Sequence, residues 1–168
     1  MRSNRVVLAV LLCLAGVSAC APRTVTQVAR IPFPQAEYDR LNVTGTAVIT
    51  GQAFMKTGGG EVKTAAGHDV LLNPVTSYSN QWYEVAYIQH KPIAKADSTL
   101  SKYVLRQTAD GDGHFTFRDV PAGDYYLVAP VYWDEPGSNG GPPVHQGGLI
   151  AKRISVAEGD TLHVILTR

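Results

Sequence analysis

The chain has 168 residues, of which 45% are hydrophobic and 17% are charged, and its formal net charge is +1. This near-neutral balance argues against a nucleic-acid-binding protein, which normally carries a clustered basic face. The two cysteines are Cys13 and Cys20, so the sequence after position 20 has to be stable through its own core, without disulfides. That remainder has the length of one ordinary domain.

Residues 1–19 have the organisation of a secretory signal peptide. Arg2 and Arg5 give a positive start, and a run of twelve apolar or small residues follows at positions 6–17. The run is shorter than the roughly 20 residues that a membrane-spanning helix needs, and small residues then lead to a cysteine. The segment Val17–Cys20 resembles the lipobox of bacterial lipoproteins, in which the cysteine is diacylated and the peptide before it is removed.

The resemblance to bacterial lipoproteins implies that Cys20 is lipidated and becomes the N-terminus. Two or three acyl chains would hold the protein on a membrane, since each buried methylene contributes about 0.8 kcal/mol. For a Gram-negative envelope, Ala21 in place of Asp after the cysteine implies the outer membrane, with the domain facing the periplasm. The sequence leaves the type of envelope open. Without Arg2 and Arg5 the chain has 13 basic and 14 acidic residues, which gives no electrostatic attraction to anionic lipid. The alternative is an ordinary signal peptidase cut that leaves Cys20 free.

After the signal peptide, residues 20–42 are expected to form the lipidated N-terminus and a tether. Pro22, Pro32 and Pro34 stand there among polar residues, a composition typical of a spacer. A single folded domain is expected over residues 43–168.

The first half of this domain contains three predicted strands and a predicted helix. Strands are expected at 46–55, where side chains alternate, at 61–63 and at 69–73, each bounded by Gly or Pro. Residues 76–90 favour an amphipathic helix, because apolar and aromatic residues recur at steps of three and four, with Ser77 or Ser79 as its N-cap. Its aromatic residues form either a recognition patch or the side that packs on the sheet: Tyr78, Trp82 and Tyr83.

The second half of the domain has clearer strand and turn signals. A short turn of helix is predicted at 97–101 and a strand at 103–108. Asp110–Gly113 is a tight turn, since Asp and Gly tolerate the positive φ of hairpins. The remaining predicted strands are 114–117, 125–131, and a final hairpin formed by 149–156 and 161–167. The total of about seven strands fits a two-sheet sandwich.

Two neighbouring segments, Asp112–Phe117 and Val120–Leu127, resemble the signature of carboxypeptidase regulatory-like domains. Ile49–Ala53 and Val70–Pro74 resemble the first strands of the same family, so the similarity extends over about 45–168. It implies an all-β, prealbumin-like (transthyretin-like) Greek-key β-sandwich of about seven strands with one inserted short helix. This family occurs as a non-catalytic accessory module in many exported proteins, and its fold alone does not fix a function.

The residues of this signature are interpreted as structural. Gly123 provides the backbone freedom that the turn needs. Tyr125 is expected to point its ring inward and to bond its hydroxyl to nearby backbone, as in the tyrosine corner of Greek-key sandwiches. Phe115, Phe117 and Leu127 would fill the core.

The sequence motifs give little support to catalysis or metal binding. Asp110, Asp112 and His114 have the spacing of a calcium loop, but the further ligands of an EF-hand do not follow. A plain hairpin turn is therefore the preferred interpretation. The five histidines are scattered singly, without metal-ligand spacing, and no nucleophile motif is present. The sequence predicts no metal, no cofactor and no enzymatic activity.

Residues 133–148 contain five Gly and three Pro. A connection of this length is unusual in a compact domain, so the segment is expected to be either a functional loop or a disordered one. Five side chains in and beside it could form an aromatic and acidic surface for a sugar or peptide: Tyr132, Trp133, Asp134, Glu135 and His145. Alternatively, the segment is a mobile tip whose aromatic side chains pack on the edge of the sandwich.

Two functional hypotheses follow from the sequence. The first is a non-catalytic envelope lipoprotein, attached to a membrane through its N-terminal lipid, whose β-sandwich binds or organises another envelope component. The second is a glycan- or peptide-binding module that uses the loop at 133–148. Neither hypothesis involves nucleic acid.

Overall fold

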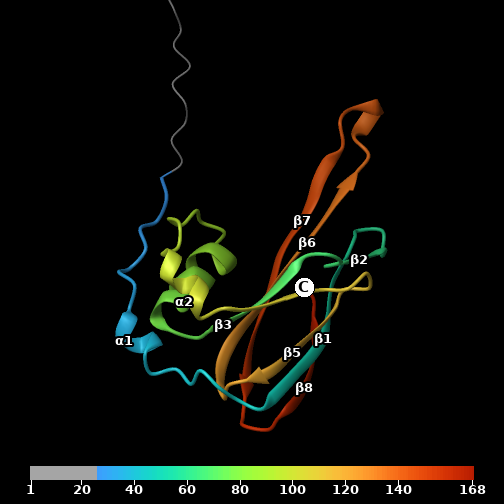
Figure 1. The fold of residues 1–168 in the computed structure, drawn as a ribbon. Coiled ribbons are helices and arrows are strands. Elements are labelled where there is room, and N and C mark those ends of the chain that lie inside the picture. Colours follow the sequence, from blue (N-terminus) through green and yellow to red (C-terminus); the bar gives the residue numbers. More distant parts are fainter. Residues whose placement is uncertain (1–25) are drawn as a thin grey trace, which may run out of the picture.

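The computed structural model of the protein describes residues 26–168, which form two β-sheets packed face to face (Figure 1). One sheet contains β1 (Ala47–Lys56), β2 (Val62–Thr64), β5 (His114–Val120) and β8 (Thr161–Leu166). The other has the order β4 (Leu105–Thr108), β3 (Asp69–Pro74), β6 (Gly123–Glu135) and β7 (Val144–Val156). The predicted all-β sandwich with a short inserted helix is confirmed, and its eight strands agree with the expected number of about seven. The predicted signal peptide and Cys20 lie outside the described residues.

The core between the sheets is formed by alternate residues of the strands, as the period of two requires. In β1 every second side chain is buried, from Ala47 to Met55. Ile49 and Leu127 are fully buried, and both predicted phenylalanines, Phe115 and Phe117, belong to the same core cluster. These apolar side chains supply the main favourable free energy of folding, because they are removed from water.

The predicted tyrosine corner is present. Tyr125 is buried, and its hydroxyl donates a hydrogen bond of 2.8 Å to the carbonyl oxygen of Pro121. Burial raises the pKa of this hydroxyl. The side chain therefore fixes the turn between β5 and β6 while its ring fills the core.

The last two strands do not form the predicted hairpin. β7 pairs with β6, whereas β8 lies in the other sheet and pairs in parallel with β1, from Val48 opposite Thr161 to Ala53 opposite Leu166. The connection at 157–160 therefore passes from one sheet to the other. Alternation shows which side chains face the core, but it does not show which neighbour a strand pairs with.

A helical segment at residues 76–104 lies over part of the outer face of the second sheet (Figure 1). It consists of α2 (Ser77–Trp82), a π-helix η1 (Tyr83–Ile88) and a 3-10 helix η2 (Ser98–Lys102). The N-cap is Thr76, and neither serine considered for that role occupies it. Ser79 completes a capping box, because its backbone N–H donates to Thr76 Oγ1 and its hydroxyl accepts from the Thr76 N–H. No helix within residues 26–168 is long and apolar enough to cross a membrane.

The described part of the segment expected to be a tether is packed on the domain. The Val28 N–H donates to the Pro92 carbonyl over 2.8 Å, and a short helix α1 (Gln35–Tyr38) follows. Tyr38 is only 1% exposed, and its hydroxyl accepts a hydrogen bond of 3.0 Å from Thr76. Within the expected tether, residues 28–38 therefore belong to the folded domain, because Tyr38 supplies an apolar ring that the prolines around it did not suggest.

The ion pairs of the second sheet make its stability depend on pH. Hydrogen bonds from Arg106 and Thr108 lower the pKa of Asp69, and bonds from Ser155 and Arg153 lower the pKa of Asp124. An unfolded chain, whose carboxyl pKa values are about 4, binds more protons in acid than the folded chain does. We therefore expect the free energy of unfolding in urea to fall as the pH drops below about 4 towards the folded-state pKa values. Asp124→Asn should reduce this acid-dependent loss, and an unchanged slope would contradict the assignment.

Candidate functional site

The segment predicted to be a sixteen-residue loop is mostly β-hairpin. β6 continues to Glu135 and β7 begins at Val144, with Glu135 opposite Val144 and Tyr132 opposite Gly147. The two strands extend beyond the sandwich as an arm, residues 132–147 (Figure 1). The loop prediction is therefore wrong, except at the tip between the two strands.

Strand alternation divides the five predicted site residues between two faces of the arm. Tyr132, Asp134 and His145 share the outer face. There His145 Nδ1 lies 2.9 Å from Asp134 Oδ1, and the His145 ring stacks on Tyr132 with centroids 5.0 Å apart. Trp133 and Glu135 lie on the opposite face, where the Trp133 indole packs on the core and donates to Glu135 Oε1 over 3.0 Å. The structure thus brings three of the five residues together.

A glycine is required at position 147, which lies beside the Trp133 ring. Gly147 has φ of +97°, and a Cβ atom there would lie 2.1 Å from the Val131 carbonyl oxygen and 3.0 Å from the Trp133 ring. An aromatic ring that covers a glycine on the neighbouring strand is a known way of fixing the register of β-strands. Trp133 is therefore a structural residue of the arm.

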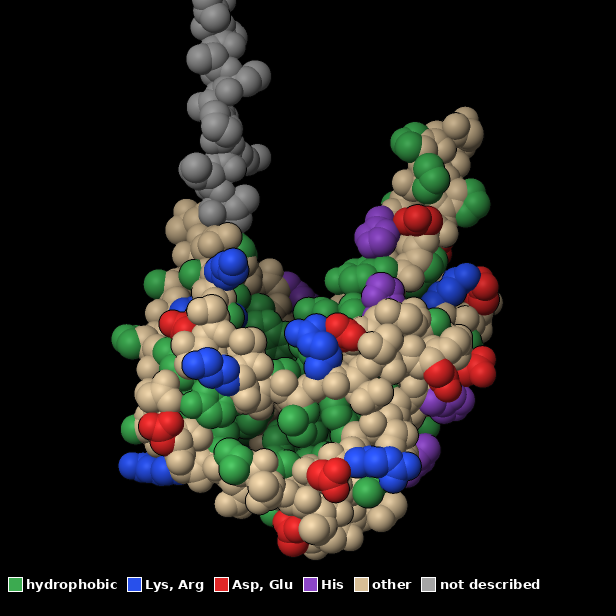
Figure 2. All heavy atoms as spheres, in the orientation of Figure 1, with side chains coloured by type: hydrophobic (Ala, Val, Ile, Leu, Met, Phe, Trp, Pro, Cys, Tyr) green, Lys and Arg blue, Asp and Glu red, His purple; other side chains and the backbone are tan. Residues whose placement is uncertain are grey.

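A hollow lies between the arm and the helical segment, and hydrophobic side chains form much of its floor (Figure 2). Trp82 and Leu149 line both of its depressions. The smaller, of about 260 Å³, lies over β3 and β6 and is also lined by Leu71, Asn73 and Val128. The larger, of about 460 Å³, lies between η1 and β7 and is also lined by Ala86, Tyr87, His90 and Gly147. We call the two depressions together the groove.

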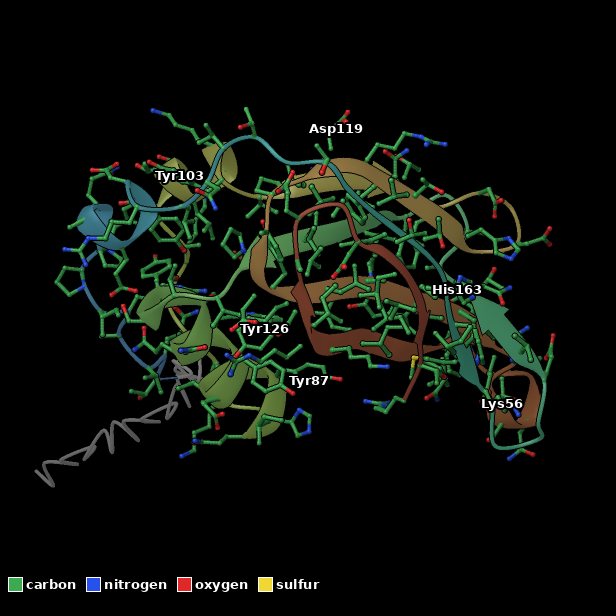
Figure 3. The ribbon with its side chains drawn as sticks, turned by 90° about the horizontal axis from the view of Figure 1, so that it is seen from below. Lys56, Tyr87, Tyr103, Asp119, Tyr126 and His163 are labelled. Atoms are coloured by element: carbon green, nitrogen blue, oxygen red, sulfur yellow. The ribbon has the colours of Figure 1, made fainter. Side chains whose placement is uncertain are left out.

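The aromatic residues of the helical segment have different positions. The Tyr83 ring stacks on Tyr126 of β6 with centroids 4.5 Å apart, and Tyr87 accepts a hydrogen bond of 3.0 Å from the Ala151 N–H. Figure 3 shows Tyr87 of the helical segment near Tyr126 of the sheet. Tyr78 is buried. Tyr83 therefore packs on the sheet, whereas the Tyr78 ring packs on Phe33 with centroids 5.4 Å apart. Trp82 is the member of the predicted set that lines both depressions of the groove.

Polar side chains complete the smaller depression. The Arg30 guanidinium lies 4.8 Å from the centre of the Tyr78 ring, and its Nε donates to the Ala94 carbonyl over 2.8 Å. The Asn73 Oδ1 atom is buried and has no hydrogen-bond partner among residues 26–168. The depression is thus an apolar cavity with an amide in its wall and a cation at its edge.

An ion pair stands on the same face of the sheet as the groove. Arg106 of β4 lies opposite Leu71 of β3 and donates to Asp69 over 2.6 Å, and Thr108 donates to the same carboxylate over 2.9 Å. These residues are exposed enough to meet a ligand that extends past Leu71. They add hydrogen-bonding groups to the β4 side of the sheet face.

The described part of the chain shows no group of three or more His, Cys, Asp or Glu side chains that could hold a metal ion. The carboxylate of Asp110, which was considered as a calcium ligand, accepts hydrogen bonds from the N–H groups of Asp112 and His114. The bond from His114 is the main reason that the pKa of Asp110 is lowered. These contacts fit the hairpin-turn interpretation.

Several residues of the groove were missed from the sequence: Arg30, Leu71, Asn73, Val128 and Leu149. Leu71 and Asn73 alternate with buried Val70 and Leu72, which places them on the outer face. That alternation was the available signal, but it did not reveal that the helical segment stands over the same face.

The similarity of this chain to known proteins is found among solved structures. No family model matches it, and no curated protein matches it either. Among solved structures, the chain is similar to a Pseudomonas aeruginosa protein proposed to bind carbohydrate, with 27% sequence identity and a TM-score of 0.73. The match covers 83% of this chain and 99% of that one, so the two proteins share the β-sandwich fold over almost the whole of the Pseudomonas chain.

Proposed function

We propose that this protein is a non-catalytic, lipid-anchored component of a bacterial cell envelope that binds a glycan in the groove. The observation that carries this proposal is the position of Trp82, which lines two adjoining depressions together with Leu149. Ligand sites are commonly concave and mainly apolar, with a few placed polar groups. The groove has this composition.

A sugar fits the groove better than a purely apolar ligand does. Its C–H faces pack on aromatic and aliphatic side chains, while its hydroxyl groups require hydrogen-bond partners when they leave water. Trp82 and Leu149 offer the apolar contacts, and Asn73 and Arg30 offer the polar ones. The name given to the similar Pseudomonas protein supports the same class of ligand.

Lipidation at Cys20 completes the proposal, because it would keep the groove at a membrane surface that carries glycans. The support for it is the order of charged, apolar and small residues that ends at Cys20. Mass spectrometry of the N-terminal peptide tests it. An unmodified Cys20 would show that the anchor is absent.

A protein partner is the second candidate, and the arm is the observation that favours it. The arm extends beyond the sandwich (Figure 1), and Tyr132 and Val144 are 40% and 49% exposed on it. Exposed aromatic residues are enriched at protein interfaces. Crosslinking of the native lipoprotein in membranes, followed by identification of the linked chain, tests this candidate.

Replacing Leu149 with alanine is expected to weaken glycan binding about tenfold, a change of about 1.4 kcal/mol. The reason is the loss of apolar surface that both depressions share. Trp82 fluorescence in the full-length protein in detergent, with Trp133→Phe as background, reports the titration with oligosaccharides.

Ile165→Ala is the matched control for this experiment. Ile165 is 44% exposed and Leu149 39%, but Ile165 lies on β8 in the other sheet. Its replacement should leave the affinity unchanged. Equal weakening by both variants, or no binding of any oligosaccharide by the parent protein, would refute the proposed site.

A further inference from the structure

We infer that the groove selects N-acetylated sugars and that Asn73 recognises their acetamido group. This inference rests on the proposed function, which it makes specific for one class of glycan. Its starting point is the unpaired amide of Asn73 in the wall of the smaller depression.

The Asn73 Oδ1 atom is an exception among buried polar atoms, in a residue that is half-buried as a whole. More than nine in ten such groups in proteins have a hydrogen-bond partner, and a buried group without one costs about 1–3 kcal/mol. Asn73 lies on the outer face of β3, opposite Tyr126 of β6. An amide kept in this position without a protein partner is explained if a ligand supplies the partner.

The neighbouring polar groups are already used. The Ser79 hydroxyl donates to the Pro74 carbonyl over 2.7 Å, and the Tyr126 hydroxyl donates to Asn80 Oδ1 over 2.8 Å. The Tyr78 hydroxyl accepts from the Asp97 N–H over 2.8 Å. The amide of Asn73 is therefore left available for a ligand.

The walls of the smaller depression determine which ligand group fits. They are predominantly apolar and include Leu71, Leu100, Val104 and Val128. An acetamido group combines a methyl group with one N–H donor and one carbonyl acceptor. Its methyl group would contact the apolar walls, and its carbonyl would accept a hydrogen bond from Asn73 Nδ2. A sugar hydroxyl in the same place would leave polar atoms against the apolar walls, which is unfavourable.

Trp82 would fix the orientation of the bound sugar ring. Because this residue borders both depressions, a pyranose ring packed on its indole would place one substituent over Asn73 and the next sugar in the larger depression. That next sugar would contact Tyr87 and approach Gly147 at the base of the arm. The groove would thus bind an oligosaccharide of at least two units.

The test compares two ligands that differ only in the acetamido group. Calorimetry of full-length protein in detergent measures binding of the β-1,4-linked tetramers of N-acetylglucosamine and of glucose. We expect the N-acetylated tetramer to bind at least about tenfold more tightly, because a site with an unpaired amide discriminates against a ligand that cannot pair with it. Asn73→Leu should remove the difference between the two ligands.

Asn42→Leu is the control variant, since Asn42 is exposed and lines a different depression. It should leave the discrimination unchanged. The melting temperature separates recognition from a structural role: Asn73→Leu removes a buried unpaired group and should not lower it. A lowered melting temperature with intact discrimination would overturn the inference.

The remaining outcomes separate this inference from the proposed function. If both tetramers bind equally and Leu149→Ala weakens both, the glycan site stands and the N-acetyl preference is wrong. If the N-acetylated tetramer is preferred even by Asn73→Leu, the role of Asn73 is wrong. If neither tetramer nor any other oligosaccharide binds, the proposed function itself fails, and this inference fails with it.

Discussion

Gly51→Ala is expected to lower the free energy of unfolding by about 3 kcal/mol or more, the upper end of what overpacking of a core costs. Gly51 lies in β1 and pairs with Phe115 of β5 and Val164 of β8. A Cβ atom at this position would lie 2.1 Å from the Val164 carbonyl oxygen and 2.6 Å from the Phe115 ring. The oxygen belongs to the backbone of β8, so β8 would have to move away from β1. Urea unfolding followed by circular dichroism measures the loss.

The control for this prediction is Gly58→Ala. Gly58 lies between β1 and β2, and no atom lies within 4 Å of the position its Cβ would occupy. Its replacement should change the free energy of unfolding by no more than about 0.5 kcal/mol, as expected for an unconstrained surface position. A small effect of Gly51→Ala would mean that β8 can separate from β1 at little cost, contrary to the parallel pairing described above.

The strands of the sandwich could be predicted because their physical cause is local. Alternating burial in β1 and β3 follows from side chains that point to opposite faces of a sheet. The Asp110–Gly113 turn and the Tyr125 corner are likewise set by neighbouring residues. The pairing of β8 with β1 could not be predicted in the same way, because it joins residues that are more than one hundred positions apart.

The arm was missed because its composition suggested a loop. Gly147 and the prolines at the tip are residues that weaken or interrupt strands, and they conceal the alternation from Tyr132 to Glu135. In the structure the neighbouring strand compensates: Gly147 lies opposite Tyr132, and the Trp133 ring covers the space that Gly147 leaves. The five candidate residues were therefore found, but not their division between two faces.

The groove depends on tertiary packing, so the sequence alone could not reveal it. Arg30, Asn73, Trp82 and Leu149 come from four separate parts of the chain. Trp82 was considered as a recognition residue from its helical spacing, but that spacing also suits a residue packed on the sheet. The stacking of Tyr83 on Tyr126 fixes which face of the helix meets the sheet, and this contact joins residues far apart in sequence.

Tyr38→Ala is expected to detach the helical segment from the sheet while the sandwich core remains folded. Tyr38 is not part of the core between the sheets, but belongs to a separate aromatic cluster. Its ring lies 4.6 Å from that of Phe33 and 4.7 Å from that of Tyr103, and its hydroxyl accepts from the N-cap residue Thr76. Removing a buried aromatic side chain costs about 3–5 kcal/mol. The variant should therefore accelerate hydrogen exchange in residues 77–88 more than in β1 and β6.

The same variant tests how the groove is formed. If the aromatic cluster holds Trp82 in place through α2, Tyr38→Ala should also weaken glycan binding, although Tyr38 does not line the groove. Tyr38→Phe is the matched control: it keeps the ring contacts and loses only the hydrogen bond with Thr76, a loss of about 1 kcal/mol. Exchange that accelerates equally in α2, β1 and β6 would show instead that the helical segment and the sandwich unfold as one unit. In that case Tyr38 would stabilise the whole domain, and the helical segment beside the groove would be as stable as the sheet beneath it.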